Sequence, residues 1–166
     1  GFRRSGIKRY VGPYKSSHVA EAGDVLVAVT DMTQERRIVA RAARVPESVG
    51  SPAVVSMDLV RLSPNPGYGG VLLYSVLRFS AFSGAVKNFA NGANVLHLHP
   101  DRIAEFKVAI PGQDLREQYE GLVGPLLDLV DTLESSSMVL RETRDLLLPR
   151  LVSGEVDVTT LDLPAE

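Results

Sequence analysis

Short apolar runs separated by turn residues fill the first 110 residues and predict short strands and helices. Residues 25–29 (Val-Leu-Val-Ala-Val) follow a turn at Gly23 and predict a buried strand. Further strands are predicted at residues 37–45, 53–62, 95–98 and 106–110. Apolar residues at helical spacing predict a helix over residues 70–82 and a further helical turn over residues 85–89. Because strands and helices do not alternate regularly, the predicted fold class is α+β with a mixed sheet.

One long helical repeat follows Pro111 and Gly112. Between residues 114 and 148, apolar residues recur at alternating intervals of four and three, which is the a/d pattern of a coiled coil. We call the predicted helix-pairing positions the leucine seam, and they are Leu115, Tyr119, Leu122, Leu126, Leu129, Leu133, Leu140 and Leu147. The pattern predicts a long coiled-coil-forming helix after the α+β domain.

The length of this helix bears on what covers the leucine seam. Its 35 residues would span about 50 Å at 1.5 Å per residue, and a domain of the preceding size is narrower than that. We therefore expect the seam to pair with a second helix. The alternative is that the helix packs along its own domain. Pro125 follows Gly124 inside the repeat, and a proline there is expected to kink the helix or restart it.

The two parts of the chain carry opposite charge. Residues 1–110 contain 14 Lys and Arg against 8 Asp and Glu, a balance of +6, and residues 111–166 contain 4 against 12, a balance of −8. A basic body favours a polyanionic partner, and an acidic helix favours a protein partner. We predict a domain at residues 1–112, a pairing helix at residues 113–150 and a C-terminal tail at residues 151–166.

Composition excludes several kinds of chemistry. The chain has no cysteine, which excludes disulfides, cysteine zinc sites and thiol catalysis. No apolar stretch is long enough to span a bilayer and no secretory signal opens the sequence, so we expect a cytoplasmic protein without a membrane partner. The sequence has no phosphate-binding loop, nucleophile elbow or dinucleotide fingerprint.

Three patterns resemble catalytic or metal sites, but each has a simpler interpretation. Residues 65–68 (Asn-Pro-Gly-Tyr) have a glycine where the amino-methyltransferase signature has its second proline. Asp101 and the Glu-x-Lys of residues 105–107 are too close in sequence for a nuclease metal site. His97 and His99 alternate along a predicted strand and could bind a metal with Asp101, although a half-buried strand and a turn explain them more simply. We therefore predict no catalytic residue, no metal site and no cofactor.

Basic and amide side chains in three stretches are candidates for binding DNA. Arg and Lys contact phosphates, and Arg, Asn and Gln can grip base edges through paired hydrogen bonds. The alternative for each of them is an ordinary solvated surface. The candidate DNA-binding residues are Lys8, Arg9, Lys15, Gln34, Arg36, Arg37, Arg41, Lys87, Asn88 and Asn91.

Four stretches resemble one protein family. Residues 140–156 (Leu-Arg-Glu-Thr-Arg-Asp-Leu-Leu-Leu-Pro-Arg-Leu-Val-Ser-Gly-Glu-Val) closely resemble the C-terminal signature of the specificity (S) subunits of type I restriction-modification systems. Residues 21–29 resemble a strand of that family's target recognition domain, and residues 92–98 resemble its Gly-Thr-x-Val-x-x-Leu segment. Pro111 with residues 117–118 (Glu-Gln) resembles the opening of the family's spacer helix.

The resemblance implies a DNA-binding role without catalysis. An S subunit has two target recognition domains, each reading half of a bipartite DNA target, and two spacer helices that pair antiparallel. It recruits methyltransferase (M) subunits and restriction (R) subunits, and these partners use S-adenosylmethionine, ATP and Mg²⁺. We expect this chain to be the C-terminal part of an S subunit, with an N-terminally incomplete recognition domain. Without the second spacer helix, it is expected to self-associate through the leucine seam.

The residues leave two other classes of function open. The chain could be a coiled-coil interaction adaptor whose basic body binds an acidic protein. It could also be a truncated nuclease or methyltransferase, which would require metal- or cofactor-dependent turnover. Titration with random duplex DNA at two salt concentrations separates DNA recognition from the adaptor function, because phosphate contacts make DNA affinity fall steeply with salt.

Overall fold

The computed structural model describes residue 2 and residues 4–156. The chain divides into two compact units, Gly1–Asp128 and Leu129–Glu166. All strands of the described residues lie in the first unit, together with the short helices and the first turns of the long helix α4. The predicted α+β class with a long C-terminal helix is confirmed. Among the described residues, the strands pair in antiparallel sheets, so the sheet is not mixed as expected.

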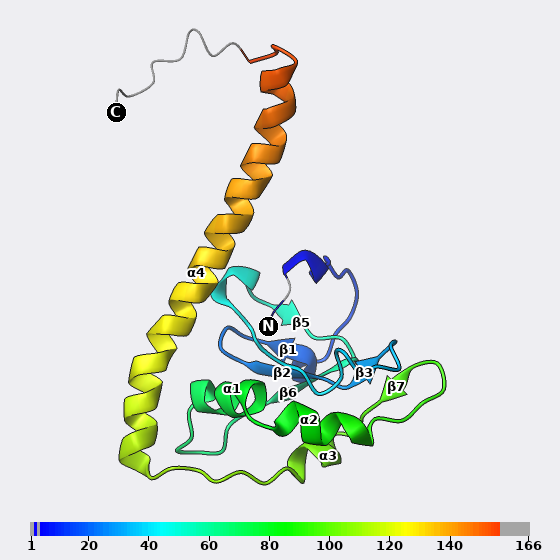
Figure 1. The fold of residues 1–166 in the computed structure, drawn as a ribbon, viewed down its shortest axis with the longest axis vertical. Helices are drawn as coiled ribbons and strands as arrows, with labels where there is room; N and C mark the ends of the chain where they lie inside the picture. Colours follow the sequence, from blue (N-terminus) through cyan, green and yellow to red (C-terminus); the bar gives the residue numbers. More distant parts are fainter. Residues whose placement is uncertain (1, 3, 157–166) are drawn as a thin grey trace. The chain divides into compact units, whose positions relative to one another are not determined.

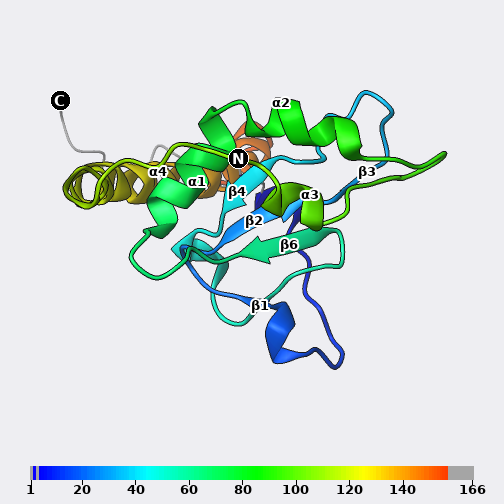
Figure 2. The same ribbon diagram turned by 90° about the horizontal axis from the view of Figure 1, so that it is seen from below.

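A three-stranded antiparallel sheet in the order β4-β2-β6 forms the centre of the first unit (Figures 1 and 2). Its strands are β2 (Val25–Ala28), β4 (Ala42–Arg44) and β6 (Leu59–Leu62). Two smaller antiparallel sheets accompany it. They pair β1 (Val19–Ala20) with β5 (Ala53–Val54), and β3 (Thr30–Asp31) with β7 (Leu96–His97).

Short helices complete the first unit. The α-helices are α1 (Gly70–Phe79), α2 (Phe82–Val86) and α3 (Asp101–Ala104). Single 3-10 turns are η1 (Arg4–Gly6), η2 (Ser16–His18), η3 (Glu47–Val49) and η4 (Lys87–Phe89). Figure 2 shows α1 and α2 on one side of the central sheet, with β1 and η2 on the other.

Strand β2 is buried on both faces, which explains its run of apolar residues. Side chains alternate along a strand, so Val25 and Val27 enter the main core with Leu77 and Phe82. Leu26 points to the opposite face and joins a smaller core with Ala20 and Val45. The predicted strand over residues 25–29 is therefore the centre of the unit.

Two predicted strands are shorter than expected. The predicted strand over residues 37–45 is limited to β4, because backbone N–H groups of residues 38 and 39 bind the buried carboxylate of Asp31 rather than a neighbouring strand. The predicted strand over residues 53–62 divides into β5 and β6. Asp58 accepts hydrogen bonds from the Thr30 and Ser56 hydroxyls at this division, which holds a turn there.

Two further predictions require correction. The helix expected over residues 70–82 ends at Phe79, since Ser80 is extended and its hydroxyl accepts the N–H of Phe82 at the start of α2. The strand expected over residues 106–110 is absent from the described structure. Phe106 packs edge-on against the ring of Phe82, 5.3 Å between centroids, and the following residues are exposed and lack a neighbouring strand.

Helix α4 (Gln113–Val152) has 40 residues, which corresponds to about 60 Å. It continues without interruption through Pro125, so the expected restart at this proline does not occur. A proline within a helix removes one backbone donor, and the neighbouring turns of α4 keep the helix continuous. The helix begins one residue before the a/d repeat of residues 114–148 and ends four residues after it.

The first turns of α4 are docked onto the domain by polar contacts. The Glu120 carboxylate accepts the N–H groups of Val71 (3.3 Å) and Leu72 (2.7 Å) at the N-terminus of α1. A Cβ atom at Gly69 would lie 1.9 Å from the Glu120 carboxyl carbon, so the glycine makes room for this contact. The Arg116 guanidinium lies 4.4 Å from the centre of the Tyr68 ring. These contacts fix the rotation of α4 about its axis within the first unit.

The docked stripe of α4 differs from the leucine seam. Arg116, Glu120 and Leu127 are half-buried, and Leu127 packs against the main core. Leu115 and Leu126, each one position earlier than a docked residue, are more than half exposed. One position rotates a helix by about 100°. In the first unit, the domain therefore leaves Leu115, Leu122 and Leu126 of the seam exposed, whereas Tyr119 is half-buried.

We predict that Glu120→Gln lowers the free energy of unfolding by about 1–2 kcal/mol, because a neutral amide offers α1 one acceptor and no charge. Chemical denaturation of the full chain measures this difference. Glu142→Gln is the control, since Glu142 is an exposed glutamate of the same helix. Equal stability of the two variants would show that Glu120 does not cap α1.

Candidate nucleic-acid interface

Pairing of β3 with β7 places two loops side by side (Figure 1). Asp31 lies opposite Leu96 in this pair. The chain leaves β3 into residues 32–41 and enters β7 from residues 90–95. We call these segments the 32–41 loop and the 90–95 loop. Each contains candidate DNA-binding residues from the sequence.

A buried carboxylate closes the 32–41 loop at its base. Asp31 is 2% exposed. One of its oxygens accepts the backbone N–H of Thr33 (2.8 Å) and the hydroxyl of the same residue (2.7 Å). The other oxygen accepts the backbone N–H groups of Ile38 and Val39. Four donors on both sides of the loop thus meet on one side chain, and residues 34–37 form the tip between them.

These hydrogen bonds determine the charge state of Asp31. Burial by itself would raise the pKa of the Asp31 carboxyl. The N–H of Ile38, the hydroxyl of Thr33, the N–H of Val39 and the N–H of Thr33 outweigh burial and hold the pKa well below its usual range. The carboxylate is therefore ionised throughout the physiological pH range.

Two residues of the 32–41 loop have left-handed backbone conformations. Arg36 has φ 54° and Ala40 has φ 62°. Such conformations are unfavourable for residues with a Cβ and persist when surrounding contacts impose them. The N–H of Ala40 donates to the carbonyl of Ala28 (2.8 Å). The loop is thus fixed by Asp31 at its base and by β2 at its end.

Two side chains join the 32–41 loop to the 90–95 loop. The Gln34 amide donates to the carbonyl of Ala93 (3.0 Å), and the Arg36 guanidinium donates to the carbonyl of Ala90 (3.4 Å). The Arg36 Nε is buried without a hydrogen-bond partner. The structure therefore brings the candidates of residues 34–41 next to the loop that contains Asn91, and it uses Gln34 and Arg36 partly to hold the loops against each other.

The 90–95 loop depends on a glycine. Gly92 has φ 151°, and a Cβ atom there would lie 1.9 Å from the carbonyl oxygen of Val95. On either side of this turn, Asn91 and His97 exchange two backbone hydrogen bonds of 3.0 and 2.8 Å. The close return of the chain at Gly92 thus holds Asn91 beside His97, and the side chain of Asn91 is exposed.

Most of the remaining candidates in these loops and in the neighbouring η4 are exposed. Arg37 is 70% exposed and lies 3.4 Å from the Glu35 carboxylate. Arg41, Asn88 and Asn91 are exposed, whereas Lys87 is half-buried in η4. The amides of both asparagines also donate to nearby backbone carbonyls, which orients them and leaves their oxygens as acceptors.

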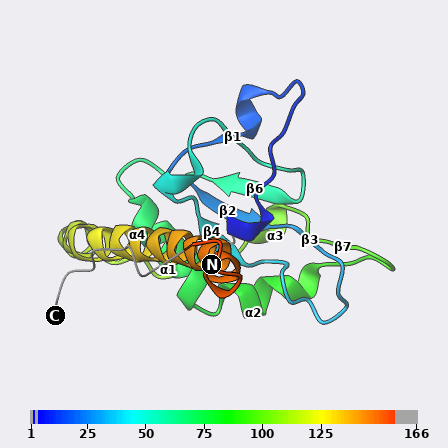
Figure 3. The ribbon, with the colours of Figure 1, turned by 90° about the horizontal axis from the view of Figure 1, so that it is seen from above.

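The N-terminal basic set lies elsewhere. Lys8, Arg9 and Lys15 are exposed on a segment without regular structure. Figures 2 and 3 show this segment beside β1 and β6, away from the tips of β3 and β7. Arg44, three positions after the candidate Arg41, has only a 16% exposed side chain and forms an ion pair with Asp128 of α4 (2.8 Å). These residues do not extend the surface formed by the two loops.

Sequence reasoning missed the residue that organises this surface. Asp31 followed by Thr33 is a typical Asx-turn signature, and this signal was available in the sequence. Its contacts with residues 38 and 39 required the fold. Exposed apolar side chains also went unnoticed: Met32 and Ile38 lie in the 32–41 loop, and Phe89 ends η4.

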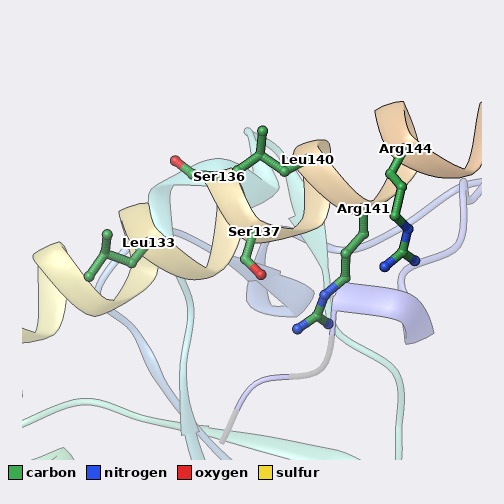
Figure 4. A pocket seen from close by; sticks show the side chains of 6 residues that line it. All are labelled: Leu133, Ser136, Ser137, Leu140, Arg141 and Arg144. Atoms are coloured by element: carbon green, nitrogen blue, oxygen red, sulfur yellow. The ribbon is translucent and has the colours of Figure 1, made fainter. Parts of the chain in front are cut away.

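Other surfaces of the described residues have fewer groups that could bind a ligand. A shallow groove on α4 is lined by Leu133, Ser136, Ser137, Leu140, Arg141 and Arg144. Figure 4 shows Arg141 and Arg144 extending to the same side of this helix. Among the described residues, no three His, Asp or Glu side chains come close enough to hold a metal ion; His99 and Asp101 form a pair at 3.2 Å. Within the same residues, each helix is too short or too polar to cross a membrane.

Comparison with known proteins gives one informative similarity. No protein-family model matches the chain. The chain is 32% identical over 89 residues to the type I restriction enzyme MjaIX specificity subunit of Methanocaldococcus jannaschii. The match covers 54% of this chain and 20% of that protein, so it extends over about one fifth of the relative's length. Over this stretch the chain is similar to a type I restriction enzyme specificity subunit, which confirms the resemblance indicated by its motifs.

Proposed function

We propose that this chain is the sequence-specific DNA-recognition part of a type I restriction-modification enzyme. It reads one half of a bipartite DNA target and recruits methyltransferase and restriction subunits in the cytoplasm. The similarity to a specificity subunit carries this proposal. The chain itself is non-catalytic, and S-adenosylmethionine, ATP and Mg²⁺ belong to its partner subunits.

The two loops at the end of the β3–β7 pair support this function. They offer guanidinium and amide groups, and these are the side chains that make paired hydrogen bonds to base edges. Arg37 and Asn91 are exposed on different loops. A rigid base with several such side chains at its tip can read base edges in a groove. The separate basic segment with Lys8, Arg9 and Lys15 would contribute phosphate contacts.

Helix α4 would supply the pairing element. Leu122 is 68% exposed in the first unit, and Leu140 is 69% exposed in the second. Exposed leucines at a/d spacing on one helix favour a helical partner. We propose that residues 113–150 pair antiparallel with a second spacer helix, and that isolated copies of this chain pair with each other. In this proposal, residues 1–112 form the DNA target recognition domain and residues 151–166 form a C-terminal tail. Residues 157–166 of the tail lie outside the described residues.

Binding of random duplex DNA tests the proposed function. The full chain should bind a pool of random duplexes, and repeated selection should enrich a short sequence. Affinity should fall steeply between 50 and 200 mM salt, on the order of 10-fold or more, because bound phosphates release counterions. Salt-independent binding or no enrichment would contradict DNA recognition. In that case, tight binding to an acidic protein would instead support the adaptor function.

Replacing Arg37 separates base reading from phosphate contact. We predict that Arg37→Ala relaxes the preference at one base pair of the enriched sequence by roughly 1–3 kcal/mol. Competition binding with duplexes altered one base pair at a time measures this effect. Lys8→Ala is the matched control, since it should weaken binding to all duplexes equally. Uniform weakening by Arg37→Ala would assign that arginine to phosphate contact.

A further inference from the structure

We infer that Asp31 is a positioning residue for sequence selectivity: its buried carboxylate holds the 32–41 loop in the one conformation that presents residues 34–37 to base edges. Asp31 itself is covered and would not touch DNA. The inference rests on the proposed function and adds the residue on which discrimination between DNA sequences depends.

The hydrogen bonds of Asp31 restrain both sides of the 32–41 loop. The two oxygens of Asp31 each accept two donors, from Thr33 on one side of the tip and from Ile38 and Val39 on the other. The carboxylate therefore spans the base of the loop. A buried N–H without an acceptor is unfavourable, so alternative loop conformations that leave these donors inside the protein are disfavoured as long as Asp31 is present.

The backbone of the 32–41 loop is strained. Arg36 and Ala40 have positive φ angles, and each such residue raises the energy of the loop by about 1 kcal/mol or more. Without a fixed base, the loop would relax to more common conformations. The contacts of Gln34 with Ala93 and of Arg36 with Ala90 depend on this same conformation, so the 90–95 loop would lose its neighbour as well.

The rigidity of this loop bears on discrimination between DNA sequences. Ordering a flexible segment on binding costs about 1–2 kcal/mol per residue of backbone. A flexible tip can also adapt to many base sequences, whereas a fixed one matches few. Among residues 34–37 at the tip, Arg37 has the exposed guanidinium, and its direction follows from the backbone that Asp31 holds. Loss of the carboxylate should therefore reduce selectivity more than general DNA affinity.

Variants of Asp31 and Thr33 in the full chain test this inference. The probes are a duplex enriched from the random pool by the unchanged protein and a duplex of the same composition in scrambled order. Asp31→Asn should reduce the ratio of the two dissociation constants by roughly tenfold or more. Its affinity for the scrambled duplex, and the salt dependence of that affinity, should stay close to those of the unchanged protein.

A milder pair of variants covers the case in which Asp31→Asn fails to fold. Thr33→Val keeps the shape of the side chain but removes the hydroxyl that lies 2.7 Å from Asp31, and it should reduce selectivity. Thr33→Ser retains a hydroxyl and should preserve the selectivity. Leu77→Ala, in the main core on α1, is the control for stability, because it should destabilise the protein without changing the ratio.

The outcomes are distinguishable. If the unchanged protein enriches no sequence, the proposed function and this inference both fail. If it enriches a sequence, and Asp31→Asn or Thr33→Val keeps the full selectivity ratio, the inference is overturned while DNA recognition stands. Loss of selectivity in Leu77→Ala as well would assign the effect to general destabilisation and would also overturn the inference.

Discussion

Replacing Leu126 and Leu133 together with lysine is expected to abolish the proposed self-association and leave the chain monomeric. Both side chains are more than half exposed within their own units and occupy a/d positions of the leucine seam. Burial of a leucine contributes about 1.5–3 kcal/mol, and each variant chain removes two leucines and adds two charges. Since both copies change, the association constant should fall at least about a thousandfold, at 1.4 kcal/mol per tenfold.

Analytical ultracentrifugation across a concentration series measures this association. Leu148→Lys is the matched control, because Leu148 is also an exposed leucine of α4 but lies outside the a/d positions. The control should associate as the unchanged chain does. If the unchanged chain is monomeric, or if Leu148→Lys is as disruptive as the double variant, the seam is not the pairing surface.

The second large effect concerns acid stability. Asp31→Asn should lower the free energy of unfolding at pH 7 by about 2–4 kcal/mol, because one acceptor is replaced by a donor facing buried N–H groups. The depressed pKa of Asp31 also gives the unchanged protein a dependence on pH. An unfolded aspartate binds its proton near pH 3.9, about where this contribution begins to decrease.

The sign of this dependence follows from linkage. The stabilisation by Asp31 is complete above the pKa of the unfolded carboxyl and is lost as pH falls toward the lower pKa of the folded one. Its slope is at most about 1.4 kcal/mol per pH unit. Urea unfolding between pH 7 and pH 3 should therefore be less pH-dependent in Asp31→Asn. The exposed Asp101→Asn is the control, and identical pH dependence of Asp31→Asn and the unchanged protein would contradict the assignment.

Elements with a strong local pattern could be predicted from the sequence. Helix α4 follows from its heptad spacing, and β2 follows from an apolar run after a turn. The strand expected at residues 37–45 contains Ile38 and Val39, whose β-branched side chains favour strands. Their N–H groups instead bind Asp31, seven and eight positions earlier. That competition depends on burial of the carboxylate, which no local pattern reports.

Contacts between distant segments explain what else escaped prediction. In the sequence, Glu120 is one of several acidic residues on a predicted helix. In the structure its carboxylate accepts the N–H groups of Val71 and Leu72, which lie 49 and 48 positions earlier. The residue types at the candidate interface were recognisable from the sequence. Which of them share a surface was not, because the pairing of β3 with β7 joins segments more than 60 positions apart.

The cap that Glu120 provides to α1 has a consequence for how such a domain can be exchanged between proteins. A fragment that ends at Gly112 would lack Glu120, so the N–H groups at the N-terminus of α1 would lose their acceptor. It would also lack Leu127, which packs against the main core, and Asp128, which pairs with Arg44. The smallest fragment that keeps these contacts therefore extends at least to Asp128. Any recombination that joins this domain to a foreign helix must carry the first four turns of α4 along with it.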